Sequence, residues 1–185
     1  MSRPDAASPP LPPARPHRTA SDGAGDLGTL DLRDPAATDR LGAALAARLA
    51  AGDTVLLAGP IGAGKSHLAR ALIQAAARRA GLPAPEVPSP TYTLVQSYDA
   101  GGLEIVHADL YRLGDTSELA ELGLAEAFGR DLCLVEWPDR LGDLAPAEAL
   151  TLELAARGAG RRAMLRGPTG WAGRLAGLAA EVARP

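Results

Sequence analysis

The sequence predicts an α/β fold of three layers, in which helices cover both faces of a mixed, largely parallel central sheet. Two short aliphatic runs, TVLLAG at residues 54–59 and DLCLVEW at residues 131–137, are typical of buried parallel strands. The first run leads through a glycine-rich loop into a segment with helical spacing of its leucines. Two further pairs of strand-like runs indicate hairpins, which add antiparallel strands to the sheet.

The predicted elements follow one another in a regular order. In residues 38–51, Leu41, Leu45 and Leu49 lie four apart, which predicts a helix with Thr38 as its N-cap. The other expected elements are the strand 54–59, the helix 65–81, a hairpin of 91–99 with 103–111, a helix over 116–128 opened by a capping box of Asp115 and Glu118, the strand 131–137 ended by Pro138, a hairpin of 150–156 with 161–167, and a helix over 171–183.

Composition limits the organisation of the chain. Residues 1–26 are rich in proline and alanine and carry little that could pack, so we expect a disordered tail before a single domain over residues 27–185. With 46% hydrophobic residues in 185, the chain can bury a real core. The only cysteine, Cys133, lies in an apolar run, which favours burial and excludes an internal disulfide.

Charge and hydropathy restrict the partners. The net charge is -3 and the sequence pI is 5.6, so the chain has no global basic field that would hold nucleic acid without sequence preference. No window reaches the roughly 18 apolar residues that cross a bilayer, and the N-terminus has no apolar segment typical of a secretion signal. We therefore expect a cytoplasmic protein with no membrane partner.

The glycine-rich loop carries the strongest functional signal. Residues 59–66, GPIGAGKS, match the phosphate-binding pattern G-x-x-x-x-G-K-[ST], with a strand before it and a helix after it. The pattern predicts a P-loop NTPase-like fold, in which backbone N–H groups and the helix N-terminus hold phosphates. Lys65 is the only lysine of the chain, and a compact ammonium on a flexible stem suits the β and γ phosphates. The residues expected to bind nucleotide here are Gly59, Pro60, Ile61, Gly62, Ala63, Gly64, Lys65, Ser66 and His67.

A magnesium ion held by the Ser66 hydroxyl needs an acidic partner at the end of a buried strand. Two candidates fit this description, Glu136 after LCLV and Asp109 after IVHA. His107 shares a strand face with Asp109, where it is a candidate hydrogen-bond partner or a structural histidine. The sequence has no N-K-x-D box for guanine, so ATP is the expected nucleotide.

Taken in order, five segments resemble the TsaE family, the ATPase subunit of the bacterial machinery that makes threonylcarbamoyladenosine in tRNA. They are GPIGAGKS, SPTYTLVQSYD, VHADLYRL, ELGLAE and LVEWPDRL, and the resemblance runs from about Thr38 to Leu141. It implies a P-loop fold, slow Mg²⁺-dependent hydrolysis of ATP, and action with two partner proteins, TsaB and TsaD. The tRNA is then reached through the complex and not by this chain directly.

The resemblance also implies roles for single residues. Lys65 and Ser66 match phosphate and Mg²⁺ ligands, Glu136 matches the metal-binding glutamate, and Asp109 matches an aspartate implicated in hydrolysis. The segment Ser89, Pro90, Thr91 and Tyr92 matches a nucleotide-dependent switch, in which the Thr91 hydroxyl would sense the γ-phosphate or the metal. Thr38 matches a threonine near the adenine, and Arg161 matches a basic position near the nucleotide, where Arg162 fits nearly as well.

Two other functions stay open at this point. A small-molecule kinase of the P-loop class would need an acceptor pocket and a mobile lid, and no arginine-rich lid stands out in the sequence. A regulatory module would bind the nucleotide and hydrolyse nothing. ATP turnover with and without the partner proteins separates these functions.

Overall fold

The structure is a computed structural model that describes residues 25–114 and 118–184. Its centre is a seven-stranded sheet in the order β1-β7-β6-β2-β5-β4-β3. Strands β6, β2, β5 and β4 are parallel, and the pairs β1–β7, β6–β7 and β3–β4 are antiparallel. The strands are β1 (Gly25–Leu32), β2 (Thr54–Ala58), β3 (Val95–Asp99), β4 (Glu104–Asp109), β5 (Leu132–Glu136), β6 (Leu150–Arg157) and β7 (Gly160–Gly167).

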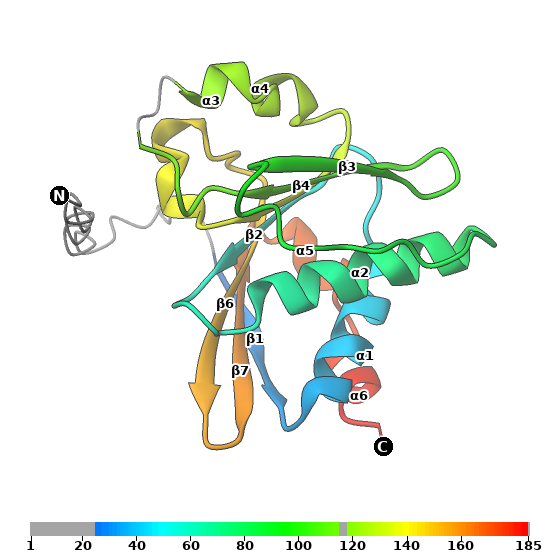
Figure 1. Cartoon of the computed structure of the whole chain (residues 1–185). Coiled ribbons are helices and arrows are strands. Elements are labelled where there is room, and N and C mark those ends of the chain that lie inside the picture. The colour runs from blue at the N-terminus through cyan, green and yellow to red at the C-terminus, as the bar shows by residue number, and fades with distance from the viewer. Residues whose placement is uncertain (1–24, 115–117, 185) are drawn as a thin grey trace, which may run out of the picture.

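Helices cover both faces of this sheet (Figure 1). On one face lie α1 (Pro35–Ala46), α2 (Lys65–Arg79) and α6 (Leu178–Val182), and α3 (Glu118–Glu121) and α4 (Leu124–Ala127) lie over the other. The remaining helical elements are α5 (Gly170–Arg174) and the 3-10 turns η1 (Pro138–Arg140) and η2 (Gly142–Leu144).

Two buried clusters fill the spaces between the layers, and adjacent residues of one strand contribute to different clusters. Leu132 and Leu134 of β5 join the larger cluster with α1 and α2, while Cys133 and Val135 join the cluster under α3 and α4. The predicted three-layer α/β fold with a mixed, centrally parallel sheet is therefore confirmed.

Several predicted boundaries are wrong. Helix α1 begins at Pro35, and its N-cap is Asp34, whose carboxylate accepts from the Ala37 N–H at 2.7 Å. Thr38 lies inside the helix and is buried, so it is not the cap. Strand β1 was not predicted, because only Leu30 and Leu32 of its eight residues are buried and the alternation is too short to stand out.

Glycines in the left-handed region divide two predicted helices. The expected helix 116–128 consists of α3 and α4, separated at Gly123 with φ 68°. The expected helix 171–183 consists of α5 and α6, separated at Gly177 with φ 78°. Likewise, the strand expected from residue 91 begins at Val95, because residues 91–94 form a turn.

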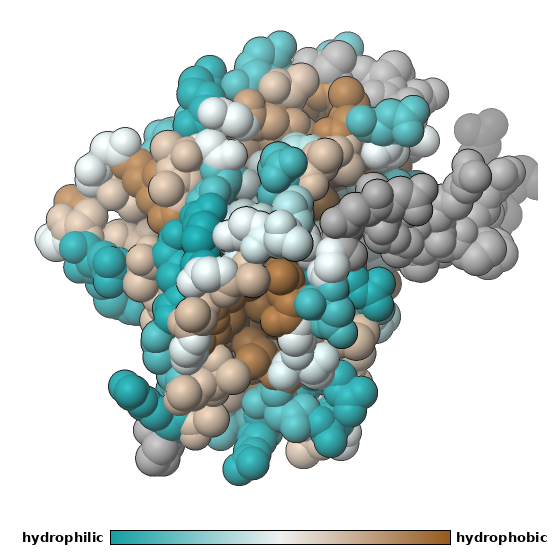
Figure 2. Space-filling view, turned by 180° about the vertical axis from the view of Figure 1, so that it is seen from behind, coloured by the Kyte–Doolittle hydropathy of each residue, from teal (hydrophilic) through white to brown (hydrophobic). Residues whose placement is uncertain are grey.

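Some predictions fall outside the described residues. They are the Asp115 half of the capping box and most of the predicted tail, although β1 starts at Gly25, inside the range assigned to that tail. Among the described residues, no helix is both long and apolar enough to cross a membrane. The face seen from behind mixes apolar residues, some gathered in a recess, with polar residues around them (Figure 2).

Candidate nucleotide and metal site

The loop between β2 and α2, predicted to bind phosphate, turns at three glycines in the left-handed region of the backbone. Gly59, Gly62 and Gly64 all have positive φ, at 133°, 76° and 103°. At Gly59 the requirement is also steric, because a Cβ there would overlap the carbonyl oxygen of Leu154 on the neighbouring strand β6. Only glycine fits this position, and it lets the loop pass close to the backbone of β6.

Lys65 is held inside the loop that it follows. Its Nζ donates to the carbonyl oxygens of Gly59 at 2.8 Å and Pro60 at 2.9 Å, and lies 3.9 Å from the centroid of the Trp137 ring. Burial lowers the pKa of the Lys65 ammonium, and the carboxylates of Glu136, Asp109 and Asp139 partly offset this effect. The ammonium thus sits between a π face and carboxylates, in a place where phosphate charge would compensate it further.

A chain of hydrogen bonds joins the loop to the sheet. The Ser66 hydroxyl at the start of α2 donates to Glu136 Oε2 at 2.9 Å, and His107 Nε2 lies 2.9 Å from Glu136 Oε1. Glu136 ends β5 and His107 lies on β4, and both residues are at most 1% exposed. The glutamate carboxylate is therefore buried with a hydroxyl on one oxygen and an imidazole on the other.

Asp109 lies beside Glu136 but faces other partners. The two acids are register partners at the ends of β4 and β5. Asp109 Oδ2 accepts from the hydroxyls of Ser89 at 3.0 Å and Thr91 at 2.8 Å, and Oδ1 accepts from the Tyr111 N–H at 3.1 Å. Two of the four residues predicted as a switch are thus bound directly to the predicted catalytic aspartate.

The other two switch residues are Pro90 and Tyr92. The Leu94 N–H donates to the Pro90 carbonyl at 2.7 Å and closes a tight turn, and Leu94 itself has φ 62°. Tyr92 is 86% exposed, with the Arg112 guanidinium over its ring. The segment is therefore fixed at its Ser89 and Thr91 side chains and open to solvent at Tyr92.

The remaining predicted residues lie around the loop. Arg161 Nη2 donates to the Gly62 carbonyl at 3.1 Å, so β7 reaches the loop through Arg161, whereas Arg162 has no such contact among the described residues. The His67 ring bonds Asp39 of α1 at 2.7 Å, and Thr38 is buried next to that aspartate. Ile61 is 72% exposed at the tip of the loop, and Ala63 is buried beneath it.

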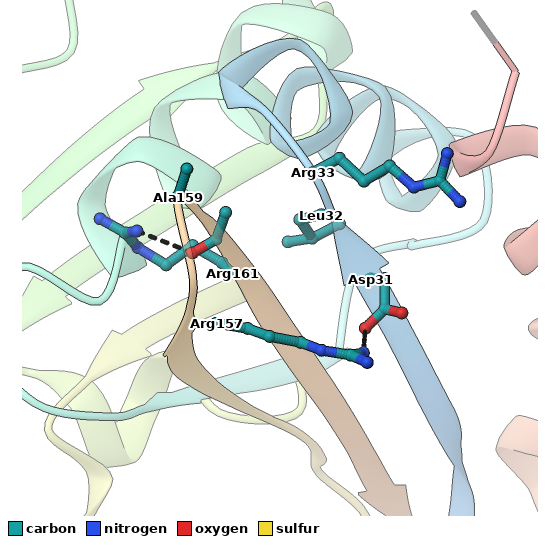
Figure 3. A pocket seen from close by; sticks show the side chains of 7 residues that line it. Asp31, Leu32, Arg33, Arg157, Ala159 and Arg161 are labelled. Carbon is teal, nitrogen blue, oxygen red and sulfur yellow. Dashed lines mark hydrogen bonds and ion pairs between the residues drawn. The ribbon is translucent and has the colours of Figure 1, made fainter.

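Beside Arg161 lies an open depression of about 320 Å³ between the end of β1 and the β6–β7 hairpin (Figure 3). It is lined by Asp31, Leu32, Arg33, Arg157, Ala159, Gly160 and Arg161, and Arg157 reaches across to pair with Asp31. This depression adjoins the phosphate loop through Arg161, which makes it a candidate for the sugar and base end of a nucleotide.

Two contacts of the site were not predicted. Trp137 follows Glu136, the last residue of β5, so a continued strand would put its side chain on the sheet face opposite to Glu136. Its φ of 60° turns the chain instead and brings the ring over Lys65. The centroids of the Trp137 and Tyr111 rings are 4.9 Å apart. His107 was a candidate hydrogen-bond partner in the sequence, but its bond to Glu136 depends on strand order, since the two residues lie 29 positions apart. Local sequence patterns carry no signal for the ring of Trp137 over Lys65 or for the choice of Glu136 by His107.

The donor set fits a magnesium ion. Ser66 supplies a hydroxyl oxygen and Glu136 a carboxylate oxygen, and the two atoms are within 2.9 Å of each other next to the loop. Hard oxygen ligands are the ones Mg²⁺ prefers, and Mg²⁺ sites of this kind use one or two protein oxygens together with phosphate and water. No group of three or more potential metal-binding side chains occurs in residues 25–114 and 118–184.

Comparisons with known proteins relate the chain to one family. The family model described as Threonylcarbamoyl adenosine biosynthesis protein TsaE matches residues 32–164. A relative from Haemophilus influenzae, tRNA threonylcarbamoyladenosine biosynthesis protein TsaE, is 42% identical over 87 residues, which are 46% of this chain and 52% of the relative. The relative of the same name from Bacillus subtilis is 35% identical over 127 residues, 68% of this chain and 75% of its own.

The matched segment covers only part of the length of the first relatives. The chain spans about half the length of the Haemophilus influenzae protein and 66% of the Rickettsia conorii protein of the same name, to which it is 36% identical over 64% of this chain. Among solved structures, the crystal structure of Bacillus subtilis YdiB superposes with a TM-score of 0.66 at 26% identity, covering 89% of this chain and 98% of that one.

Proposed function

This chain belongs to the TsaE family of tRNA threonylcarbamoyladenosine biosynthesis proteins, and on that premise we propose that it binds ATP with Mg²⁺ and hydrolyses it slowly. In this proposal it works in the cytoplasm as a subunit with TsaB and TsaD, and tRNA is bound through the complex. The hydrolysis drives a conformational change and transfers no phosphoryl group to a metabolite.

The observation that carries the proposal is the hydrogen bond between Ser66 and Glu136. It places the hydroxyl that follows the loop lysine against a buried carboxylate at the end of the adjacent parallel strand. A hydroxyl and a strand-end carboxylate beside a phosphate loop are the protein ligands of a typical Mg–nucleotide site. When bound there, the ion would neutralise phosphate charge and orient the phosphates.

The side chains of this chain then have separate tasks. The loop N–H groups bind phosphate oxygens, and Lys65 leaves the Gly59 and Pro60 carbonyls to contact phosphate. Asp109 holds a buried acceptor beside Glu136, placed to orient a water molecule. Because Asp109 also binds Ser89 and Thr91, a change at the phosphates can reach the exposed Tyr92 through this aspartate.

We assign the base end of ATP to the depression beside Arg161. The depression there borders the loop and is open to solvent, with polar and charged groups around Leu32. Thr38 is buried within α1, so a role near the adenine would require its backbone or a local movement. The proposal therefore gives Arg161 the larger part in nucleotide contact.

The test is ATP turnover by the chain alone, with TsaB and TsaD, and with a panel of small metabolites. The proposal expects slow turnover alone and faster turnover with the two partners, because the charge of the transition state is fully compensated only in the complex. Equal rates in both conditions contradict the proposal, and phosphorylation of a metabolite supports the small-molecule kinase instead.

Variants separate hydrolysis from mere binding. We expect Glu136→Ala and Asp109→Ala to lower turnover, and Lys65→Ala to abolish nucleotide binding. Asp143→Asn is a matched control, since Asp143 is an exposed acid outside the site. If Glu136→Ala and Asp109→Ala support tRNA modification as well as the control does, the chain is a regulatory nucleotide-binding module.

A further inference from the structure

His107 is a fully buried histidine whose polar contact within the described residues is made to a single group. Its Nε2 lies 2.9 Å from Glu136 Oε1, and its Nδ1 has no hydrogen-bond partner in the described part of the chain. The carboxylate oxygen is the acceptor of this pair, so we assign Nε2 as the donor. Among the described residues, the ring therefore forms a hydrogen bond with Glu136 and takes part in no other polar network.

The bond fixes how the Glu136 carboxylate is turned. The terminal torsion of a glutamate side chain has a broad energy profile, so packing alone does not select one rotation of the two oxygens. Here His107 holds Oε1 and the Ser66 hydroxyl faces Oε2. Only Oε2 is then directed to the place where Ser66 could share an ion.

Resting on the function proposed above, we infer that His107 is a positioning residue that makes the site selective for Mg²⁺ over Ca²⁺. A carboxylate binds Ca²⁺ through one oxygen or through both, whereas Mg²⁺ takes single oxygens in a strict octahedron. With Oε1 bound to His107, Glu136 offers one oxygen and the two-oxygen mode is blocked. Loss of the donor frees the carboxylate to rotate and removes this discrimination.

Two substitutions of similar size separate the positioning role from simple packing. In His107→Gln the amide nitrogen is far enough from the backbone to stand where Nε2 stands, so the donor to Oε1 is kept. In His107→Asn the amide is one bond shorter and does not reach Oε1. Both variants replace the ring by a polar amide, so they share most of the packing cost.

The measurement is the affinity of the isolated chain for a non-hydrolysable ATP analogue by calorimetry, in Mg²⁺, in Ca²⁺ and with a chelator. For the wild type and His107→Gln we expect Mg²⁺ to strengthen binding more than Ca²⁺ does. For His107→Asn we expect the gain in analogue affinity caused by Mg²⁺ to fall by about 10-fold or more, which is usual when a residue that hydrogen-bonds a metal ligand is lost. The gain caused by Ca²⁺ should change less. Thermal unfolding without nucleotide shows that each variant is folded at the assay temperature.

The outcomes separate this inference from the proposed function. If the wild type binds no Mg–nucleotide, the proposed function fails and this inference fails with it. If the wild type prefers Mg²⁺ and folded His107→Asn keeps the same preference, only the role of His107 is overturned. Should His107→Asn not fold, a His107→Gln variant that loses the preference also overturns it, because that variant keeps the donor.

Discussion

Replacing Gly59 by alanine tests whether the phosphate loop is fixed against the sheet. The new Cβ would overlap the Leu154 carbonyl oxygen of β6 and lie 3.2 Å from the Ala63 Cβ. Residues forced into rare backbone regions cost about 1–3 kcal/mol, and overpacking costs about 1–3 kcal/mol more. We therefore expect Gly59→Ala to lower the free energy of unfolding by about 2–6 kcal/mol, from a total of about 5–15 kcal/mol for ordinary domains.

Gly62→Ala is the matched control for this prediction. Gly62 also has positive φ, at 76°, but a Cβ there meets nothing within 4 Å. Only the left-handed backbone cost of about 1–2 kcal/mol applies to it. Urea unfolding followed by circular dichroism, without nucleotide, gives both losses, provided that the denaturant slope is unchanged.

The result that refutes the reasoning is a loss in Gly59→Ala that is no larger than the loss in Gly62→Ala. In that case the loop moves away from Leu154 without cost, and the close approach to β6 does not hold it. A larger loss in Gly59→Ala should come with weaker binding of an ATP analogue, because the loop N–H groups are displaced together with Gly59.

Three further predictions follow from buried or paired groups. Burial raises the pKa of the Cys133 thiol to about 12. We therefore expect iodoacetamide to leave the native protein unmodified at about pH 8 and to alkylate the thiol in urea. Rapid labelling of the native protein would contradict this. The Arg48 guanidinium lowers the pKa of the Glu181 carboxyl below its ordinary 4.5, so this group stabilises the fold above that pH and loses the effect as the pH falls. Glu181→Gln should therefore lower the melting temperature at neutral pH and lose its effect well below pH 4.5; a constant difference would exclude the ion pair as the cause. Asp109→Ala removes the acceptor of Ser89 and Thr91, so hydrogen exchange should rise in residues 89–94 and stay unchanged in the core strand β5.

The sequence predicts those parts of the fold that depend on contiguous residues. The spacing of apolar residues and the glycine motif predict the strand 54–59, the glycine loop and the helix from Lys65. The structure has β2, the loop and α2 in these places. The two hairpins and the strand before Pro138 also agree. Errors occur where the pattern is weak, at β1, and where one glycine changes the backbone, at Gly123 and Gly177. The starts of α1, at Pro35, and of β3, at Val95, were also misplaced.

The sequence also predicted part of the candidate site and left part of it open. From the residues alone, Glu136 and Asp109 were equal candidates for the partner of Ser66, and the resemblance to a known family favoured Glu136. In the structure the two acids end neighbouring strands in register, and only Glu136 contacts the serine. Asp109 faces the segment of Ser89 and Thr91 instead.

By itself, the amino-acid sequence determined the phosphate loop, its flanking strand and helix, and the residue types able to hold phosphate and an ion, because these depend on neighbours in the chain. Only the tertiary structure decided that Ser66, Glu136 and His107 form one line of hydrogen bonds and that Trp137 lies over Lys65. Those contacts join residues 29 to 72 positions apart, and strand order, register and a single left-handed residue set them, none of which a local pattern records.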